Sequence, residues 1–287
     1  MTRIAVIGNG KWAKNIVRTL EGLPDLSAVV CGPGEASPPN IDGVIIATPS
    51  ATHAEVALPY IQRGLPTFIE KPMATSLLDA KRLLQAAEKS LAPVLVGHLH
   101  LYNPAFKKFV TLLPEIGKLR LVVSESMGGE DRKDCSVLWD WLPHDVSMAL
   151  RIFGTSPTEV QARAFGAAGT AMYSNVMATY LFGEVPFVSV AGWTSPYKRR
   201  CLIASGEAGA ILFDDRADKK LALYKAKAVS YPTYGNEAPL ASEMMAFLKI
   251  AREKKANDAE LEEGLAVVRL IACAEESADK GGKKVVC

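Results

Sequence analysis

Residues 3–13 read RIAVIGNGKWA, and this stretch decides the fold. Its first six residues form an apolar run typical of a buried strand, and apolar residues at helical spacing begin again with Trp12. Between them, Gly8 permits a tight turn and Gly10 lets a backbone approach a pyrophosphate. This placement predicts a dinucleotide-binding loop, and the alternative is a plain strand-to-helix turn. The predicted cofactor contacts in the loop are Gly8, Asn9, Gly10, Lys11, Trp12 and Ala13.

The first part of the chain continues as alternating strands and helices. Beyond the helix at 12–23, strands are predicted at 27–31, 43–47, 67–69 and 93–97, with helices at 53–63 and 76–89. This alternation predicts an α/β fold, with a Rossmann-like, doubly wound parallel sheet covered by helices on its faces. We therefore expect residues 1–115 to form a dinucleotide-binding Rossmann domain.

The remaining chain has a different pattern, with many strands separated by turn residues. Strands are predicted at 119–127, 159–164, 171–182, 186–193, 198–205, 210–213 and 221–224, and helices at 139–153, 240–254 and 259–280. Residues 116–287 are therefore expected to form an α+β domain with a large mixed or antiparallel sheet. Such a sheet leaves a face to cover, so we expect a homodimer or homotetramer built through it.

Bulk composition excludes several classes of protein. The chain has 33 basic and 31 acidic residues, a net charge of +2, and no basic stripe of the kind that binds nucleic acid. No apolar run is long enough to cross a membrane, and the first residues do not resemble a signal peptide. The five cysteines are scattered, so we predict reduced thiols in a cytoplasmic protein without a metal site.

One expected feature of the dinucleotide site is missing from the sequence. A ribose-binding acid should end the second strand, but that position reads Cys31-Gly32-Pro33, with Glu35 and Asp25 outside the strand end. The absence of an acid removes the repulsion that excludes a 2′-phosphate, and Lys11 and Lys14 lie nearby. The sequence therefore slightly favours NADP(H) over NAD(H). Alternatively, neither lysine contacts the cofactor.

Several motifs together resemble the glucose-fructose oxidoreductase / inositol dehydrogenase (Gfo/Idh/MocA) family. They include the glycine loop, Ala-Thr-Pro-Ser at 47–50 with His53, Glu-Lys-Pro at 70–72, Tyr-Asn-Pro at 102–104, and Leu-Trp-Asp at 138–140 with His144. The resemblance extends over essentially the whole chain, and its strings are most similar to members that act on sugars or nucleotide sugars. It implies an NAD(P)-dependent dehydrogenase or reductase acting on CH–OH groups.

The chain also departs from the pattern of that family. Members usually carry a helix, a strand and a further helix between the second strand and the Ala-Thr-Pro-Ser strand. Here only residues 32–42, rich in Pro and Gly, make this connection. That region normally builds the adenine side of the cofactor site, so the departure bears directly on cofactor binding.

Lys71 is the first predicted catalytic residue. The Glu70-Lys71-Pro72 string follows a predicted strand, at the sheet edge where open α/β sheets bind ligands. A lysine there can donate to an alkoxide-like oxygen and stabilise its charge. The resemblance makes Lys71 catalytic, and both Glu70 and Lys71 are predicted cofactor contacts. The alternative for Lys71 is an ordinary surface lysine.

Asp140 and His144 form the second catalytic pair. Their i, i+4 spacing puts both on one face of a helix, where the carboxylate could orient the imidazole. Pro143 suits a first helical turn, so we expect the helix to span 142–153 with Asp140 just before it. The resemblance makes His144 the proton donor or acceptor and Asp140 an orienting or substrate-binding group. Alternatively, Asp140 is a helix cap and His144 packs against Trp141.

Other candidates carry weaker signals. The residues Thr48, Pro49, Ser50 and His53 follow a strand and could contact the nicotinamide ribose, although Ser50 or Thr52 could equally cap a helix. The family resemblance adds a substrate-binding set of His98, Tyr102 and Asn103. Of these, Asn103 with Pro104 also makes a good helix start. His98 and His100 alone would make a poor metal site.

The sequence thus predicts an oxidoreductase that moves a hydride between nicotinamide and a hydroxyl or keto group of a sugar or nucleotide sugar. The substrate oxygen would bind against Lys71 and His144, with the proton passing through His144. The alternative is a non-catalytic or weakly active member that acts as a ligand-binding or assembly protein. The shortened 32–42 segment favours this alternative, and the intact catalytic residues argue against it.

Overall fold

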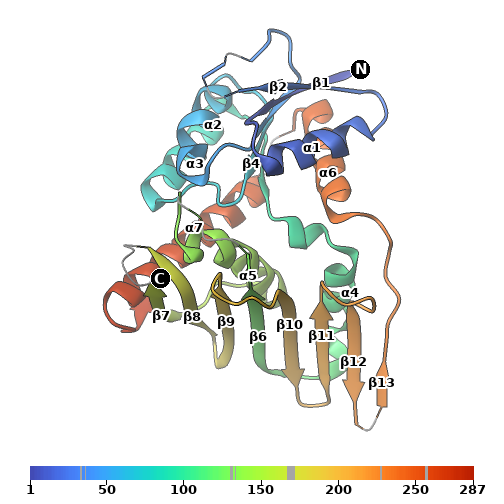
Figure 1. The fold of residues 1–287 in the computed structure, drawn as a ribbon, viewed down its shortest axis with the longest axis vertical. Coiled ribbons are helices and arrows are strands. Elements are labelled where there is room, and N and C mark those ends of the chain that lie inside the picture. The colour runs from blue at the N-terminus through green and yellow to red at the C-terminus, as the bar shows by residue number, and fades with distance from the viewer. Residues whose placement is uncertain are drawn as a thin grey trace. The chain divides into compact units, whose positions relative to one another are not determined.

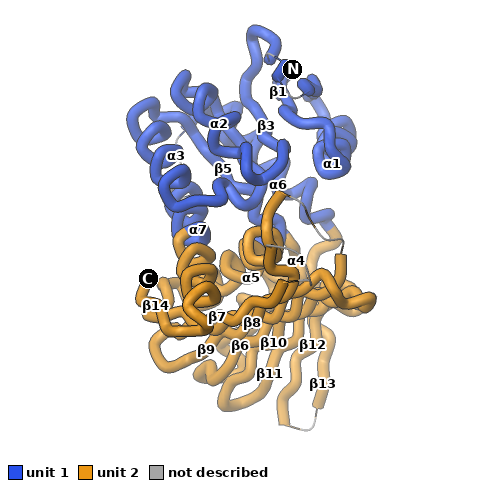
Figure 2. Tube along the Cα trace, turned by 60° about the vertical axis from the view of Figure 1, so that its left-hand side comes forward, with its two compact units in different colours: residues 1–102, 237–268 blue, residues 103–236, 269–287 orange. Residues whose placement is uncertain are grey.

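The computed structural model describes residues 1–32, 34–35, 37–129, 132, 134–166, 172–226, 228–255 and 258–287. The chain divides into two compact units (Figure 2). Unit 1 contains Met1–Tyr102 and Glu237–Val268, and unit 2 contains Asn103–Asn236 and Arg269–Cys287. These units differ from the expected domains of residues 1–115 and 116–287, because residues 103–115 lie in unit 2 and a later segment returns to unit 1.

Unit 1 is built on a five-stranded parallel sheet, as the alternating pattern predicted. Its strands are β1 (Thr2–Ile7), β2 (Leu26–Cys31), β3 (Gly43–Ile46), β4 (Thr67–Glu70) and β5 (Val94–Gly97), in the order β2-β1-β3-β4-β5. The helices that connect them are α1 (Lys11–Glu21), α2 (His53–Gln62) and α3 (Leu77–Ser90). The carboxyl ends of the strands therefore meet at one edge, where ligands of such sheets bind.

The shortened segment after β2 leaves that strand at the edge of the sheet. Residues 32–42 form no helix or strand in the part that is described, with Pro33 and Ala36 outside it. As a result, β2 pairs only with β1 among the described residues, and Val30 of β2 is 47% exposed. In the ranges that the structure describes, the strand and helices that the resembled family usually carries after its second strand are thus absent.

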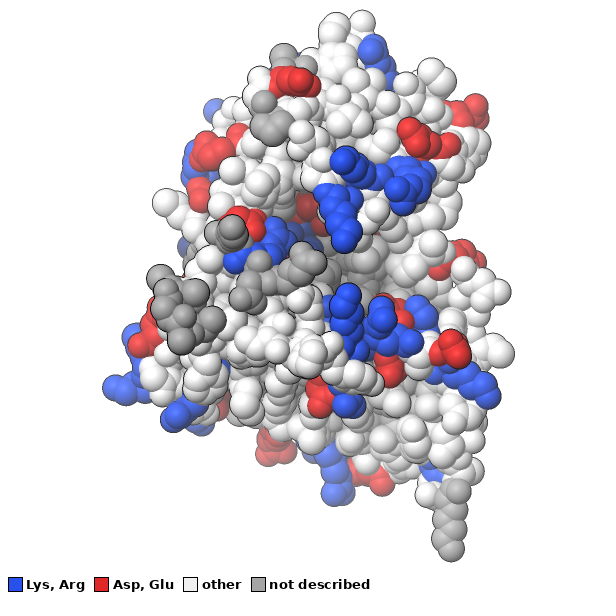
Figure 3. All heavy atoms as spheres, viewed as in Figure 1, with Lys and Arg blue, Asp and Glu red and all other residues white. Residues whose placement is uncertain are grey.

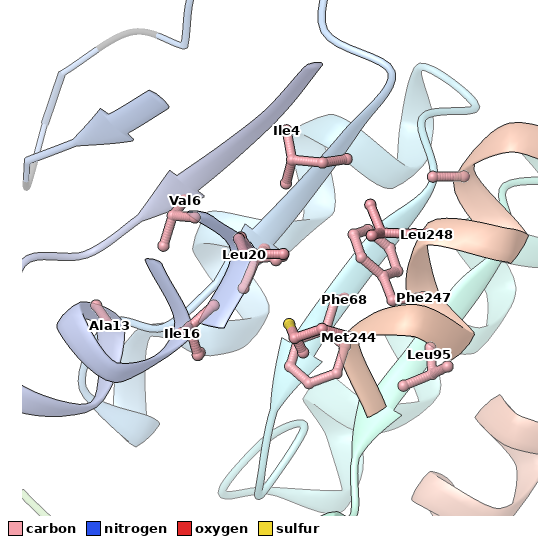
Figure 4. Close-up of a cluster of buried hydrophobic side chains, with 12 residues drawn as sticks. Ile4, Val6, Ala13, Ile16, Leu20, Phe68, Leu95, Met244, Phe247 and Leu248 are labelled. Carbon is pink, nitrogen blue, oxygen red and sulfur yellow. The ribbon is translucent and has the colours of Figure 1, made fainter. Parts of the chain in front are cut away.

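The core of unit 1 contains a helix from far along the chain. Helix α6 (Pro239–Glu253) contributes Met244, Phe247 and Leu248 to a cluster with side chains of β1, β4 and α1 (Figure 4). The ring of Phe247 meets that of Phe68 edge-on, with centroids 5.7 Å apart. The expectation that this helix belongs with residues 116–287 is not met, because its apolar face covers the parallel sheet.

Unit 2 is built on a nine-stranded mixed sheet, as predicted. Its order is β13-β12-β11-β10-β6-β9-β8-β7-β14, and every neighbouring pair is antiparallel except the parallel pair β6 and β9. The strands are β6 (Leu119–Met127), β7 (Glu159–Gly166), β8 (Tyr173–Phe182), β9 (Val185–Gly192), β10 (Arg199–Gly206), β11 (Ala210–Asp214), β12 (Leu221–Lys225), β13 (Ala228–Ser230) and β14 (Val285–Val286).

Unit 2 contains the helices α4 (Pro104–Leu112) and α5 (Val137–Phe153) (Figure 1). Helix α7 (Asp258–Asp279) belongs to unit 1 up to Val268 and to unit 2 from Arg269. The helix predicted at 139–153 is α5, but the start at residue 142 that Pro143 suggested is wrong, because α5 begins at Val137 and has Pro143 inside it. Its first turn buries Val137 and Leu138 completely. Burying two such side chains stabilises by about 3–6 kcal/mol, which offsets the roughly 3 kcal/mol cost of an internal proline.

The prediction of five reduced cysteines is wrong for two of them. Cys273 and Cys287 form a disulfide with Cα atoms 6.2 Å apart. The chain turns back after α7 through Gly281 and Gly282, both at positive φ, and β14 then pairs with β7. This return brings the last residue beside the helix. Cys31, Cys135 and Cys201 are buried thiols.

Within the described ranges, every helix is too short or too polar to cross a lipid bilayer.

Candidate functional site

The glycine loop lies between the end of β1 and the start of α1. Gly8 has φ of +130°, which L side chains rarely adopt. A Cβ atom at Gly8 would lie 2.3 Å from the carbonyl oxygen of Ala47, the residue that follows β3. Only glycine therefore lets the first loop pass this close to the second.

The N-terminal end of α1, which follows the glycine loop, is accessible. Gly10 is the N-cap residue of α1, and a Cβ atom placed on it would meet nothing within 4 Å among the described residues. Asn9 and Lys11 are exposed, whereas Ala13 is buried against the sheet. The first N–H groups of α1 thus face open space, an arrangement that fits the pyrophosphate of a dinucleotide.

A side-chain hydrogen bond joins the glycine loop to the Glu-Lys-Pro loop. The indole Nε1 of Trp12 donates to Oε1 of Glu70 at 2.5 Å, and the Lys71 N–H donates to Oε2 of Glu70 at 3.2 Å. Gly97 on the neighbouring strand leaves room for this carboxylate, since a Cβ atom there would lie 3.2 Å from its Oε2. Two motifs separated by 58 residues are therefore held together in unit 1.

His53 joins the same region to the loop after β3. Its Nδ1 lies 2.8 Å from the Pro72 carbonyl oxygen and its Nε2 lies 2.9 Å from that of Thr48. The ring is almost completely buried, with 1% exposed. The predicted contacts Thr48, Pro49 and Ser50 thus lie on a loop that His53 ties to the loop of Lys71. Within this loop the Thr52 hydroxyl donates to the Pro49 carbonyl oxygen at 2.7 Å.

The predicted substrate residues fall in both units. His98, at the end of β5, is buried in unit 1, and its Nδ1 lies 3.9 Å from Oε1 of Glu263 on α7. Tyr102 ends a short 3₁₀ turn, Leu99–Tyr102, which also carries His100. Asn103 is the N-cap of α4 in unit 2, where its Oδ1 accepts the Ala105 N–H at 3.0 Å. Among the described residues, no three His, Cys, Asp or Glu side chains form a metal-binding group.

In unit 2, Asp140 and His144 both lie on α5, and the predicted shared face is present. The two oxygens of Asp140 accept hydrogen bonds from Arg132 Nη1 at 3.1 Å and from Trp193 Nε1 at 3.0 Å. Arg132 also forms an ion pair with Asp134 at 2.7 Å. The Asp140 carboxylate is therefore held in a fixed position by two donors, which sequence spacing alone did not indicate.

A buried acid anchors the helix that carries His144. Asp145 is fully buried and accepts hydrogen bonds from three serine hydroxyls: Ser124 at 2.9 Å, Ser126 at 3.0 Å and Ser189 at 2.5 Å. Burial raises the pKa of the carboxyl group, and the three hydrogen bonds oppose this shift. This cluster was not predicted from the sequence, although the serines at the buried, alternating positions 124 and 126 of β6 were its signal.

Arg200 on β10 was also missed as a neighbour of the candidate residues. Its guanidinium carbon lies 3.4 Å from the centre of the Trp141 ring, and its Nη1 donates to the Met127 carbonyl oxygen at 2.7 Å. Burial lowers its pKa to about 10, so the side chain stays charged at neutral pH. The ring of Trp141 in turn lies 6.0 Å from that of His144.

A hollow of about 370 Å³ lies beside the glycine loop in unit 1. It is lined by Asn9, by Lys14 and Arg18 of α1, and by Val30 of the edge strand. Figure 3 shows basic side chains gathered over α1. Past the end of β2, the Gly32 N–H donates to Oε2 of Glu35 at 2.7 Å. The Glu35 carboxylate, on the turn that follows β2, therefore lies near the end of this strand.

Comparisons with known proteins agree with this architecture. Residues 34–98 match the model of an oxidoreductase family with an NAD-binding Rossmann fold, GFO_IDH_MocA. A solved structure from Magnetospirillum magnetotacticum MS-1, named as an oxidoreductase, is 32% identical, with a TM-score of 0.86. The match covers 95% of this chain and 99% of that one.

The chain belongs to the Gfo/Idh/MocA family. Within this family it is similar to the oxidoreductase YrbE of Bacillus subtilis, 33% identical over 133 residues, which are 44% of this chain and 39% of YrbE. It is also similar to the UDP-N-acetylglucosamine 3-dehydrogenase of Acidithiobacillus ferrooxidans, 26% identical over 155 residues, which are 53% of this chain and 49% of that protein. The matches thus span less than half the length of these two relatives.

For this Gfo/Idh/MocA protein, the fold and the family resemblance seen in the sequence are confirmed. The segment matched by the family model contains the loops of Thr48 and Lys71 and reaches His98. The glycine loop precedes that segment and is supported by its own geometry. The roles of individual residues stay predictions.

Proposed function

We propose that this chain is an NAD(P)(H)-dependent oxidoreductase acting on a hydroxyl or keto group of a sugar or nucleotide sugar. The observation that carries the proposal is the hydrogen bond from Trp12 to Glu70. It holds the first turn of α1 beside the loop of Lys71, which supports a cofactor site that extends from the helix end to the lysine.

The chain's own residues would divide the chemistry among them. The nicotinamide, when bound, supplies or accepts the hydride. Lys71 donates to the substrate oxygen and stabilises the negative charge that develops on it. His144 takes or returns the hydroxyl proton. Asp140, fixed by Arg132 and Trp193, orients polar groups of the substrate near His144.

The substrate class rests on the named relatives and on the polar groups of unit 2. One relative acts, by its name, on a UDP-sugar, and others are named as inositol dehydrogenases. Polyhydroxylated rings need several fixed donors and acceptors, which Asp140, His144 and the predicted contacts His98, Tyr102 and Asn103 could provide. A non-catalytic binding role is less well supported, because Lys71, Asp140 and His144 are all present.

NADP(H) is the preferred cofactor in this proposal. Lys14 and Arg18 line the hollow beside the glycine loop, where their charges would attract a 2′-phosphate. Glu35 has the opposite effect, but its carboxylate accepts the Gly32 N–H. Glu21 of α1 is a second acid, and it lines the hollow itself. We expect the two basic side chains to outweigh the two acids, because Glu35 is already engaged by the Gly32 N–H.

A second copy of this chain is the proposed partner, in a homodimer or homotetramer. The sheet face opposite the fully buried residues carries an apolar row formed by Leu212, Ile203, Val123 and Val188, which are neighbours in register. All four are partly exposed. A row of this kind is suited to burial against another apolar sheet face.

The first experiment is a fluorescence titration of the purified full chain with NADH and NADPH, after a check for nucleotide carried through purification. Micromolar or tighter binding, followed by turnover with a panel of sugars and UDP-sugars, is the expected result. No binding of either cofactor, with none carried through, would contradict the proposal and favour the ligand-binding alternative.

A further inference from the structure

Glu243 on α6 lies in surroundings that do not stabilise an ionised carboxylate. Its side chain is fully buried, and neither carboxylate oxygen has a hydrogen-bond partner among the described residues. An ionised carboxylate buried without donors costs several kcal/mol or more. Proteins avoid this cost by keeping such a group protonated.

Helix and strand geometry aim Glu243 at Glu70. On β4, Phe68 and Glu70 are two residues apart and therefore share a face, about 6.6 Å from one another. On α6, Glu243 and Phe247 are four residues apart and also share a face, about 6 Å from one another. Arg252, near the end of α6, donates to Thr2 Oγ1 at the start of β1, so α6 runs antiparallel to the strands of the parallel sheet. With Phe247 packed on Phe68, the matching spacing then sets Glu243 beside Glu70, whose charge acts on it.

The two acids have unequal surroundings. Glu70 accepts hydrogen bonds from Trp12 and from the Lys71 backbone, which favour its ionised form, although burial raises its pKa to about 7. Burial and the charges of Glu70 and Glu260 raise the pKa of Glu243 well above its usual range. A proton shared by the pair therefore resides on Glu243.

Other titratable groups lie on the elements around this position. Lys71 follows β4, and its charge favours an ionised Glu70. Helix α7 carries Glu260, which lines a hollow on the surface, is only partly buried, and contributes to raising the pKa of Glu243. The remaining groups nearby are Glu263 on α7 and His98, His100 and Tyr102 around the 3₁₀ turn. None of these removes the need for a proton on Glu243.

We infer that Glu243 is a neutral acid that keeps the negative charge of the pair on Glu70, and that it is thereby a positioning residue for the loop of Lys71. The part that concerns Lys71 rests on the proposed function. With Glu243 ionised, two buried carboxylates would repel, and Glu70 would protonate or leave its bond to Trp12. The glycine loop and the Lys71 loop would then lose their connection.

The test compares the wild type with Glu243→Gln, a neutral side chain of the same shape. The unfolded wild type ionises Glu243 above about pH 4.5 while the folded protein keeps it protonated, so wild-type stability falls as pH rises. The test is urea unfolding at several pH values above about 4.5. The folding equilibrium constant of the variant, divided by that of the wild type, should rise about tenfold per pH unit as long as folded Glu243 stays protonated. Glu253→Gln, an exposed position on the same helix, should show no such gain.

Infrared spectroscopy provides a second readout that does not depend on turnover. Glu70, with a pKa of about 7, and buried Asp145 can also contribute protonated carboxyl bands, so the readout is the wild-type spectrum minus that of Glu243→Gln, which should contain one protonated carboxyl band at neutral pH. If the Gln variant fails to fold, a band that persists in both the wild type and Asp145→Asn above about pH 8, where Glu70 is ionised, tests the inference. A stability gap that does not change with pH, or an unchanged band, would overturn it.

Activity tests the positioning role separately. Cofactor affinity and turnover of the wild type should fall at alkaline pH as Glu243 ionises, and those of Glu243→Gln should not. Identical pH profiles would overturn the link to Lys71. If neither protein binds a cofactor, the proposed function fails, while the infrared and stability results still decide the protonation state.

Discussion

The two units fix their candidate site residues by different means. In unit 1 the contacts are largely to main-chain atoms: His53 to two carbonyl oxygens, Glu70 to a backbone N–H, and Gly8 against the Ala47 carbonyl. In unit 2 they are between side chains, with Asp140 held by Arg132 and Trp193 and Asp145 by three serines. A main-chain frame survives many side-chain changes, whereas a buried side-chain network depends on each member.

The largest expected effects concern catalysis, and they test whether both units take part in it. Lys71→Ala and His144→Ala should each lower turnover by about 10²–10⁴-fold, because each removes a group that stabilises charge or moves a proton. Steady-state kinetics with the identified substrate measures this, and circular dichroism checks that each variant is folded. Full activity of either variant would show that the replaced residue, Lys71 of unit 1 or His144 of unit 2, has no catalytic role.

The next effect concerns the buried acid of unit 2. Asp145→Ala should lower the free energy of unfolding by about 3–5 kcal/mol, because three buried hydroxyls lose their acceptor and a cavity remains. Urea denaturation measures the loss. Asp145→Asn, which keeps the shape and one acceptor oxygen, should cost less. Equal losses in both variants would show that the carboxylate charge, rather than packing and hydrogen bonding, stabilises the cluster.

A matched pair of tryptophans compares the two units directly. Trp193→Phe in unit 2 removes a donor to buried Asp140 and should cost about 2 kcal/mol of unfolding free energy. Trp12→Phe in unit 1 removes a donor to Glu70, but Trp12 is 39% exposed and should cost about 1 kcal/mol. A larger loss for Trp12→Phe would reverse the contrast between the units.

The smallest expected effect concerns the choice between NADPH and NADH by side chains of unit 1. Replacing Lys14 and Arg18 together by Ala should weaken NADPH binding about 5–30-fold, since each charge-assisted contact contributes roughly 0.5–1 kcal/mol near the surface, and should leave NADH binding nearly unchanged. Glu35→Gln should strengthen NADPH binding slightly. Equal weakening of both cofactors would mean that these side chains do not distinguish them.

Unit 1 could be predicted well because its signals are local. The glycine loop, the strand–helix alternation and the Glu-Lys-Pro string each occupy a few consecutive residues, and parallel-sheet topology brings their ends to one edge. The bond between Trp12 and Glu70 was not predicted, yet both residues had been assigned to the same site. Glu35 was judged to lie outside the strand end because the turn that folds it back to Gly32 leaves no sequence signature.

The contacts of unit 2 were harder to predict from the sequence, because they join residues far apart in the chain. The Asp145 cluster joins β6, α5 and β9, and the disulfide joins a helix to the end of the chain. Neither has a local pattern. The start of α5 was misplaced because the burial of Val137 and Leu138 outweighs the local preference of Pro143. The return of α6 to unit 1 likewise depends on Phe247 meeting Phe68.

The place of α6 in the unit 1 core has a consequence during synthesis of the chain. The five strands are complete once residue 97 has been made, but the helix that covers Ile4, Phe68 and Leu95 ends only at Glu253. At about 5–20 residues per second, a ribosome needs roughly 8–30 s to make the intervening stretch. Throughout that interval the nascent sheet keeps an apolar face in water. Unit 1, although most of it is made first, therefore matures late, and the growing chain is a natural client for chaperones that shield apolar surfaces.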